Sequence, residues 1–130
     1  MTNRPIVLVV DDRLLDRLLL DAVLSPEGVD VVTVSSPLRV VEIAEANLPS
    51  LIILDLEMPE KNGFEVCESL REHEATKDIP IMFISASERR SDVERAAMYG
   101  CFDYIQKPYD AEHLVGRVKE CVCRGRRSDD

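Results

Sequence analysis

Residues 51–63 read Leu-Ile-Ile-Leu-Asp-Leu-Glu-Met-Pro-Glu-Lys-Asn-Gly, an apolar run that meets the Asp55 carboxylate and then turns. A short apolar run bounded by turn residues is typical of a strand buried on both faces of a parallel sheet. Asp55 is therefore expected at the carboxyl end of a central strand, the edge where open α/β sheets bind their ligands. The alternative is that Asp55 only caps the turn, because Pro59 and Asn62-Gly63 are suitable turn residues in any fold. Acidic residues elsewhere in the chain decide between the two.

Apolar strand-like segments alternate with segments of helical spacing along the whole chain. The predicted strands are residues 6–10, 29–34, 51–54, 81–84 and 102–105. Helices are expected before Pro26 and Gly28, from the Ser36 cap with Pro37, after Gly63, over 88–99, and over about 111–123. The apolar residues that mark these helices are Leu15, Leu18, Leu19, Ala22, Val23, Val40, Val41, Ile43, Phe64, Cys67, Leu70, Val93, Ala96, Ala97, Leu114, Val115, Val118 and Val122.

This alternation predicts an α/β fold, a flavodoxin-like three-layer sandwich with a five-stranded parallel sheet and five helices. The natural strand order is 2-1-3-4-5, which places strands one and three side by side at the topological switch point. Asp11, Asp12 and Asp55 then converge in one crevice, and Ser85 and Lys107 end the neighbouring strands at the same edge. We expect one domain over residues 1–124, with 125–130 as a tail or the start of a linker.

Composition limits the function classes. The net charge of the 130-residue chain is -9, which disfavours direct nucleic-acid binding by this domain. No apolar stretch approaches membrane-spanning length, and the first residues lead into a strand rather than a signal peptide, so we expect no membrane association. The four cysteines lack the spacing of a zinc site and are expected as thiols in a reducing cytoplasm; they are Cys67, Cys101, Cys121 and Cys123.

Three carboxylates in one crevice repel one another unless they hold protons or a cation neutralises them. Hard oxygen ligands with open positions suit Mg²⁺, which keeps waters and recruits phosphate. One carboxylate can then attack phosphorus and form an acyl phosphate, and Asp55 is the candidate because it stands alone at a tight turn. Asp11 and Asp12 are better suited to holding the cation. Lys107 supplies positive charge for phosphoryl oxygens, and Ser85 supplies a hydroxyl donor.

Taken together, these residues resemble those of the receiver domain of two-component response regulators, over nearly the whole chain. The matching segments are Val10-Asp11-Asp12, Leu54-Asp55-Leu56-Glu57-Met58-Pro59 with Asn62-Gly63, Ile79-Pro80 through Ser85-Ala86, and Gly100-Cys101-Phe102-Asp103-Tyr104-Ile105-Gln106-Lys107-Pro108. Each segment alone is weak evidence for the family, but all of them together, in this order and register, are highly specific for it.

The resemblance implies a signalling switch in which Asp55 accepts a phosphoryl group from a sensor histidine kinase or a histidine phosphotransfer protein. It implies that Asp12, Asp55 and the backbone carbonyl of Glu57 bind Mg²⁺, with Asp11 acting through water. It also implies that Tyr104 turns inward with Ser85, remodelling the surface of helix 4, strand 5 and helix 5 for a downstream effector. A homodimer through that surface is left open. The Lys107-Pro108 bond is expected to be cis.

Such a chain catalyses only its own phosphoryl transfer and autodephosphorylation and is not an enzyme with a diffusible substrate. One alternative is a pseudo-receiver, a binding module without phosphotransfer. Another is a haloacid-dehalogenase-like phosphatase, which needs a second aspartate where this chain has Glu57. Taken singly, Lys107, Ser85 and Tyr104 have ordinary structural explanations as surface, strand-end and core residues.

Overall fold

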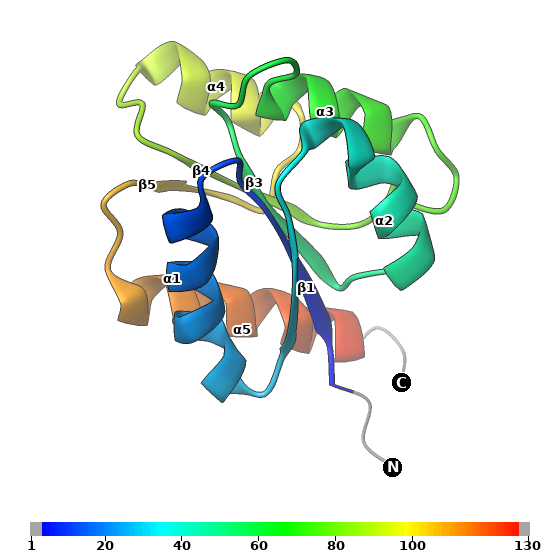
Figure 1. Ribbon diagram of the computed structural model, residues 1–130, viewed down its shortest axis with the longest axis vertical. Coiled ribbons are helices and arrows are strands. Elements are labelled where there is room, and N and C mark those ends of the chain that lie inside the picture. Colours follow the sequence, from blue (N-terminus) through cyan, green and yellow to red (C-terminus); the bar gives the residue numbers. More distant parts are fainter. Residues whose placement is uncertain (1–3, 128–130) are drawn as a thin grey trace.

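A five-stranded parallel sheet of order β2-β1-β3-β4-β5 forms the centre of the computed structural model, which describes residues 4–127 (Figure 1). The strands are β1 (Ile6–Val10), β2 (Asp30–Val34), β3 (Leu51–Asp55), β4 (Ile81–Ser85) and β5 (Asp103–Gln106). The helices are α1 (Leu14–Leu24), α2 (Val40–Asn47), α3 (Gly63–Arg71), α4 (Arg90–Met98) and α5 (Ala111–Arg127), with 3₁₀ turns at Ser25–Glu27 and Pro37–Arg39. The predicted fold class and strand order are confirmed.

Helices cover both faces of the sheet: α1 and α5 lie on one side, and α2, α3 and α4 on the other (Figure 1). Successive residues of a strand point to opposite faces, so β1 contributes to two cores. Leu8 and Val10 pack in the cluster that contains α2 and α3, whereas Val7 and Val9 pack in the cluster that contains α1 and α5. The apolar run that begins at Leu51 is buried on both faces because it lies in a central strand.

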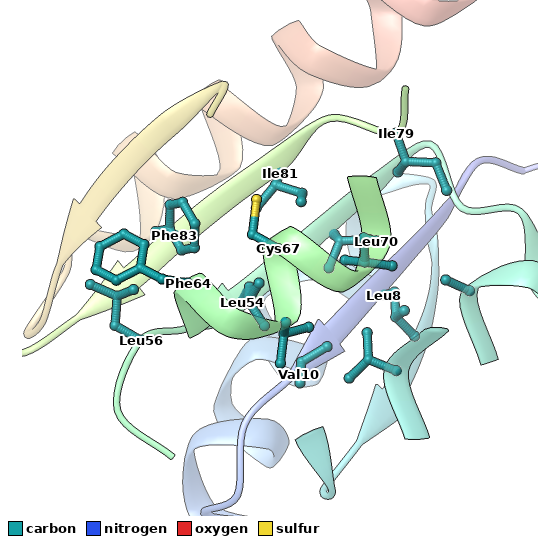
Figure 2. Packing of buried hydrophobic residues seen from close by; sticks show 14 of the residues in the cluster. Leu8, Val10, Leu54, Leu56, Phe64, Cys67, Leu70, Ile79, Ile81 and Phe83 are labelled. Carbon is teal, nitrogen blue, oxygen red and sulfur yellow. The ribbon is translucent and has the colours of Figure 1, made fainter. Parts of the chain in front are cut away.

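The α3 helix is anchored to the sheet by the apolar face that its sequence predicts. Phe64, Cys67 and Leu70 are buried and face the strands beside Leu54 and Phe83 (Figure 2). The ring centroids of Phe64 and Phe83 lie 5.2 Å apart, in the tilted arrangement that aromatic pairs favour. This packing fixes the first turn of α3 against the carboxyl end of β3, where Asp55 lies.

The α1 helix is confirmed as a helix, but its buried face differs from the leucines that predicted it. Its buried residues are Leu20 and Leu24. The exposed fractions of its other leucines are 61% for Leu14, 67% for Leu15, 56% for Leu18 and 48% for Leu19. A helix with this many leucines supports more than one apolar stripe of helical spacing, so spacing alone does not select the stripe that packs.

One more helix face and several element boundaries also differ from the sequence predictions, most of the boundaries by one or two residues. In α4, Ala96 is the only residue fully buried, and Val93 and Ala97 are exposed. Strand β5 begins at Asp103, one residue after the predicted start, and α5 extends to Arg127 rather than ending at Cys123. Residues 128–130 of the predicted tail lie outside the described residues, and the domain boundary at 124 stays a prediction. Within residues 4–127, none of the helices combines the length and the apolar character needed to cross a membrane.

Candidate functional site

Three aspartates meet at the carboxyl edge of the sheet, as the strand order predicts. Asp11 and Asp12 follow β1, and Asp55 ends β3, the strand that pairs with β1 at Val10 and Leu54. One carboxylate oxygen from each aspartate lies within 4.8 Å of the other two. Asp11 is fully buried and Asp55 is 3% exposed, whereas Asp12 is exposed. The cluster therefore has two buried acids and one that faces solvent.

The loops that follow β1 and β3 hold the two buried carboxylates in place. Asp11 accepts a hydrogen bond from the amide of Arg13 at 2.9 Å, and Asp55 accepts one from the amide of Glu57 at 3.1 Å. Behind Asp55, a Cβ on Gly63 would lie 2.6 Å from the Asp55 carbonyl oxygen, so only glycine fits at the start of α3. Asn62 caps that helix in a capping box.

Lys107 reaches the cluster from the loop after β5. Its Nζ lies 3.1 Å from Asp11 Oδ2, 3.0 Å from Asp16 Oδ2 and 3.4 Å from Asp55 Oδ2. Sequence reasoning missed Asp16, which stands in the first turn of α1. The available signal was an acid in the helix turn that directly follows the Asp11-Asp12 pair. The peptide bond between Lys107 and Pro108 is cis.

Burial and neighbouring charge change the acid–base properties of the site. Burial, together with the negative charge of Asp11, raises the pKa of Asp55 to about 7, against the opposing effect of Lys107. Burial alone would lower the pKa of Lys107, but its hydrogen bond to Asp16 and the charges of Asp55 and Asp11 outweigh burial and raise that pKa. The pKa of Asp55 thus stays raised even with the lysine present, mainly because its carboxylate is buried.

This donor set fits a hard divalent cation. The three aspartates offer only carboxylate oxygens, and burial and the charge of Asp11 disfavour the ionised form of Asp55, which a bound cation would stabilise. Mg²⁺ is typically bound by one or two carboxylates and water. The residues present therefore fit the magnesium that the sequence predicts.

A second group of contacts lies at the end of β4 and involves Ser85, Glu57 and Tyr104. The Ser85 hydroxyl donates to Glu57 Oε1 at 2.5 Å, and the amide of Ala86 donates to the same oxygen at 3.2 Å. The Tyr104 hydroxyl donates to the carbonyl of Ser87 at 3.1 Å. The family resemblance gives Glu57 a role through its backbone carbonyl. No spacing in the sequence predicts that the Glu57 side chain accepts hydrogen bonds from Ser85 and Ala86.

Comparison with known proteins now identifies the family, because residues 7–119 match the response regulator receiver domain. The chain belongs to this family. It is 34% identical over 120 residues, 92% of this chain and 50% of the relative, to the DNA-binding dual master transcriptional regulator RpaA of Synechocystis. It is 29% identical over 113 residues, 87% of this chain and 92% of the relative, to the polar-differentiation response regulator DivK of Brucella ovis.

A solved signal receiver domain from Vibrio parahaemolyticus has the same fold, with a TM-score of 0.90, 24% identity, and coverage of 98% of this chain and 96% of that one. The chain spans about half the length of the first curated relatives that it matches. Receiver domains are signalling modules of two-component systems rather than enzymes acting on free substrates. The acidic cluster of Asp11, Asp12 and Asp55 lies within the matched residues and could hold a metal ion.

Proposed function

We propose that this receiver domain is a phosphorylation-dependent switch in which Asp55 accepts a phosphoryl group. The observation that carries this proposal is the buried Asp55 carboxylate, with Lys107 Nζ 3.4 Å away and two further aspartates close enough to share a cation. The donor is a phosphohistidine on a sensor histidine kinase or on a histidine phosphotransfer protein. We place this exchange in the cytoplasm, as the cysteine usage of the sequence predicts.

In the transfer, a carboxylate oxygen of Asp55 attacks phosphorus and forms the new O–P bond. The P–N bond of the phosphohistidine breaks, and its electron pair returns to the imidazole. The Lys107 ammonium, which already contacts Asp11 and Asp55, would stabilise the negative charge of the phosphoryl oxygens during transfer. Hydrolysis by water later restores the Asp55 carboxylate and releases inorganic phosphate.

Asp12, Asp55 and the Glu57 carbonyl would hold Mg²⁺ directly, with Asp11 acting through a water. The bound ion would neutralise the clustered carboxylates and offset the charge of the phosphoryl oxygens during transfer. Two features support this assignment: the three aspartates offer only oxygen ligands, and Asp55 has a raised pKa, so a nearby cation would stabilise its ionised form.

The output is a change at the face formed by α4, β5 and α5. Phosphorylation adds negative charge and acceptor oxygens at Asp55, and Ser85 and Tyr104 are the residues that transmit this change. A downstream effector domain or protein would bind to that face, or a second copy of the chain would pair through it. The name of the Synechocystis relative supports a regulatory output, and the net charge of -9 makes an effector a better partner for this domain than nucleic acid.

The test is phosphorylation by acetyl phosphate with Mg²⁺, followed by intact mass beside an Asp55→Asn control. We expect the added mass of one phosphoryl group on the wild-type protein, lost with a measurable half-life, and no addition on Asp55→Asn. Absence of modification with acetyl phosphate, with beryllofluoride and with a phosphohistidine donor would favour a pseudo-receiver.

A further inference from the structure

The side chain of Glu57 makes the contacts that an anion on Asp55 would be expected to make. One carboxylate oxygen, Oε1, accepts hydrogen bonds from both the Ser85 hydroxyl and the Ala86 amide. Two donors that converge on one charged oxygen constitute an anion-binding arrangement, and such charge-assisted bonds are among the stronger ones in proteins. In this structure the anion that accepts from these two donors is the Glu57 carboxylate.

These donors lie directly beside the phosphoacceptor. Asp55 is paired in the sheet with Ile84, so Ser85 and Ala86 are the next residues beyond that register position. Glu57 lies two residues after Asp55, and its own amide donates to Asp55 Oδ1. A phosphoryl group on Asp55 would therefore extend toward the two donors that Glu57 already uses, and its oxygens would meet a like charge there.

The same contacts lead to Tyr104 through a short series of hydrogen bonds. The Ser85 oxygen that donates to Glu57 also accepts from the amide of Ser87 at 2.9 Å. The carbonyl of Ser87 then accepts from the Tyr104 hydroxyl. The loop between β4 and α4 is thus held in one arrangement, and the acceptor at its start is the Glu57 carboxylate rather than a phosphoryl oxygen.

We infer that the Glu57 carboxylate is an internal occupant of the phosphoryl-binding donors, and that phosphorylation of Asp55 displaces it. Before phosphorylation, Glu57 holds Ser85 and Ala86, and through them the Ser87 contact of Tyr104. Glu57 is exposed as a residue and lines a surface hollow with Ala86, Ser87, Glu88 and Arg89, so its carboxylate has an exit to solvent. This inference rests on the proposed function of Asp55 and assigns Glu57 a positioning role in it.

The experiment compares the binding of beryllofluoride, an analogue of the phosphoryl group, at saturating Mg²⁺ to the wild type, Glu57→Ala and Glu57→Gln. Because Glu57→Ala removes the competing carboxylate, we expect it to bind beryllofluoride at least about fivefold more tightly than the wild type does, the lower end of typical couplings between sites. Glu57→Gln keeps an acceptor oxygen without the charge, so its affinity should lie between the two. Glu88→Ala removes one negative charge from the β4–α4 loop, which lines the same hollow, and within residues 4–127 no hydrogen bond joins it to Ser85 or Ala86, so it should bind like the wild type.

Amide NMR resonances give a second readout that needs no phosphoryl analogue. Without beryllofluoride, the amide resonances of Ala86 and Ser87 should shift in Glu57→Ala. In Glu88→Ala the Ala86 resonance, which is not next to the substitution in the sequence, should remain in place. Wild-type affinity in Glu57→Ala, or unmoved Ala86 and Ser87 resonances, would overturn the inference while leaving Asp55 as the phosphoacceptor. If neither the wild type nor any variant bound beryllofluoride, the proposed function would fail and this inference with it.

Discussion

Lys107 is the residue on which the balance of charge at the carboxyl edge of the sheet depends. Its Nζ contacts two aspartates whose side chains are almost entirely inaccessible, Asp11 at 0% and Asp55 at 5%, while the lysine side chain is itself 20% exposed. Ion pairs of this kind contribute little net stability, but removing one partner leaves the other charge buried and uncompensated. The lysine therefore matters to folding as well as to the phosphoryl group.

Replacement of Lys107 by methionine, which keeps most of the side-chain volume, should destabilise the protein. Without Mg²⁺ at pH 8, we expect a loss of about 1–3 kcal/mol in the free energy of unfolding, because Asp11 and Asp55 lose their common cation. Urea unfolding measures the change. Asp16→Asn removes a partly exposed partner of the same lysine and should cost less; an equal cost would mean that the buried pair is not the source.

The raised pKa of Asp55 predicts a pH dependence with a definite sign. Its value of about 7 exceeds the ordinary 3.8, so between these values the folded protein binds more protons than the unfolded chain does. Stability attributable to Asp55 therefore falls as the pH rises through this window. Without Mg²⁺, Asp55→Asn should match the wild type near pH 4 and exceed its stability at pH 8 by roughly 2–4 kcal/mol. Denaturant unfolding across pH tests this, and a constant difference between the two proteins would contradict it.

At the residue scale, the sequence predicts the acids that end strands and misses the side chains whose direction depends on a loop or helix turn. Asp11, Asp12 and Asp55 follow buried runs, so the strand order alone brings them together. Asp16 meets Lys107 only once the first turn of α1 is oriented. The carboxylate of Glu57 depends on how its loop turns toward β4, and no periodicity in the sequence carries that information.

At the element scale, helix α1 shows why a strongly apolar pattern can predict a helix and still misplace its core face. Its leucines occur at neighbouring as well as helically spaced positions, so several faces are apolar. Packing against the sheet and α5 selects Leu20 and Leu24, which are one helical turn apart. By contrast, α3 has one apolar stripe, and that stripe is buried as predicted.

Two leucine substitutions in α1, one on the buried face and one on the exposed face, test which face of the helix packs against the sheet. Leu20 is 1% exposed, so Leu20→Ala should lower the free energy of unfolding by about 2–4 kcal/mol through lost burial and the cavity that remains. Leu18 is 56% exposed, and Leu18→Ala should change it by less than about 0.5 kcal/mol. Chemical denaturation of both variants provides the measurement. A larger loss in Leu18→Ala would show that the face inferred from leucine spacing is the packed one.

At the scale of the whole molecule, the parallel sheet turns distant parts of the chain into one site. Strand order β2-β1-β3-β4-β5 places the ends of β1 and β3 together and brings Lys107 from the far end of the sequence beside them. Right-handed crossovers limit alternating strands and helices to a few strand orders, and the observed order is one of the common ones, so it could be predicted from the alternation. The site is consequently formed only when the whole sheet is folded, and ligands that bind it should stabilise the domain as a unit.

Added Mg²⁺ should therefore raise the stability of the entire domain in a single unfolding transition. At a Mg²⁺ concentration one hundred times its dissociation constant, the expected gain is about 2.7 kcal/mol, because the folded protein gathers the three aspartates and the unfolded chain does not. The gain should shrink toward pH 5, since a proton on Asp55 competes with the ion at the raised pKa. Thermal unfolding with Mg²⁺ at pH 8 and pH 5 measures both effects. Asp12→Asn, which alters the one exposed member of the cluster, should reduce the gain, whereas the same gain in Asp12→Asn or at pH 5 would place the ion elsewhere.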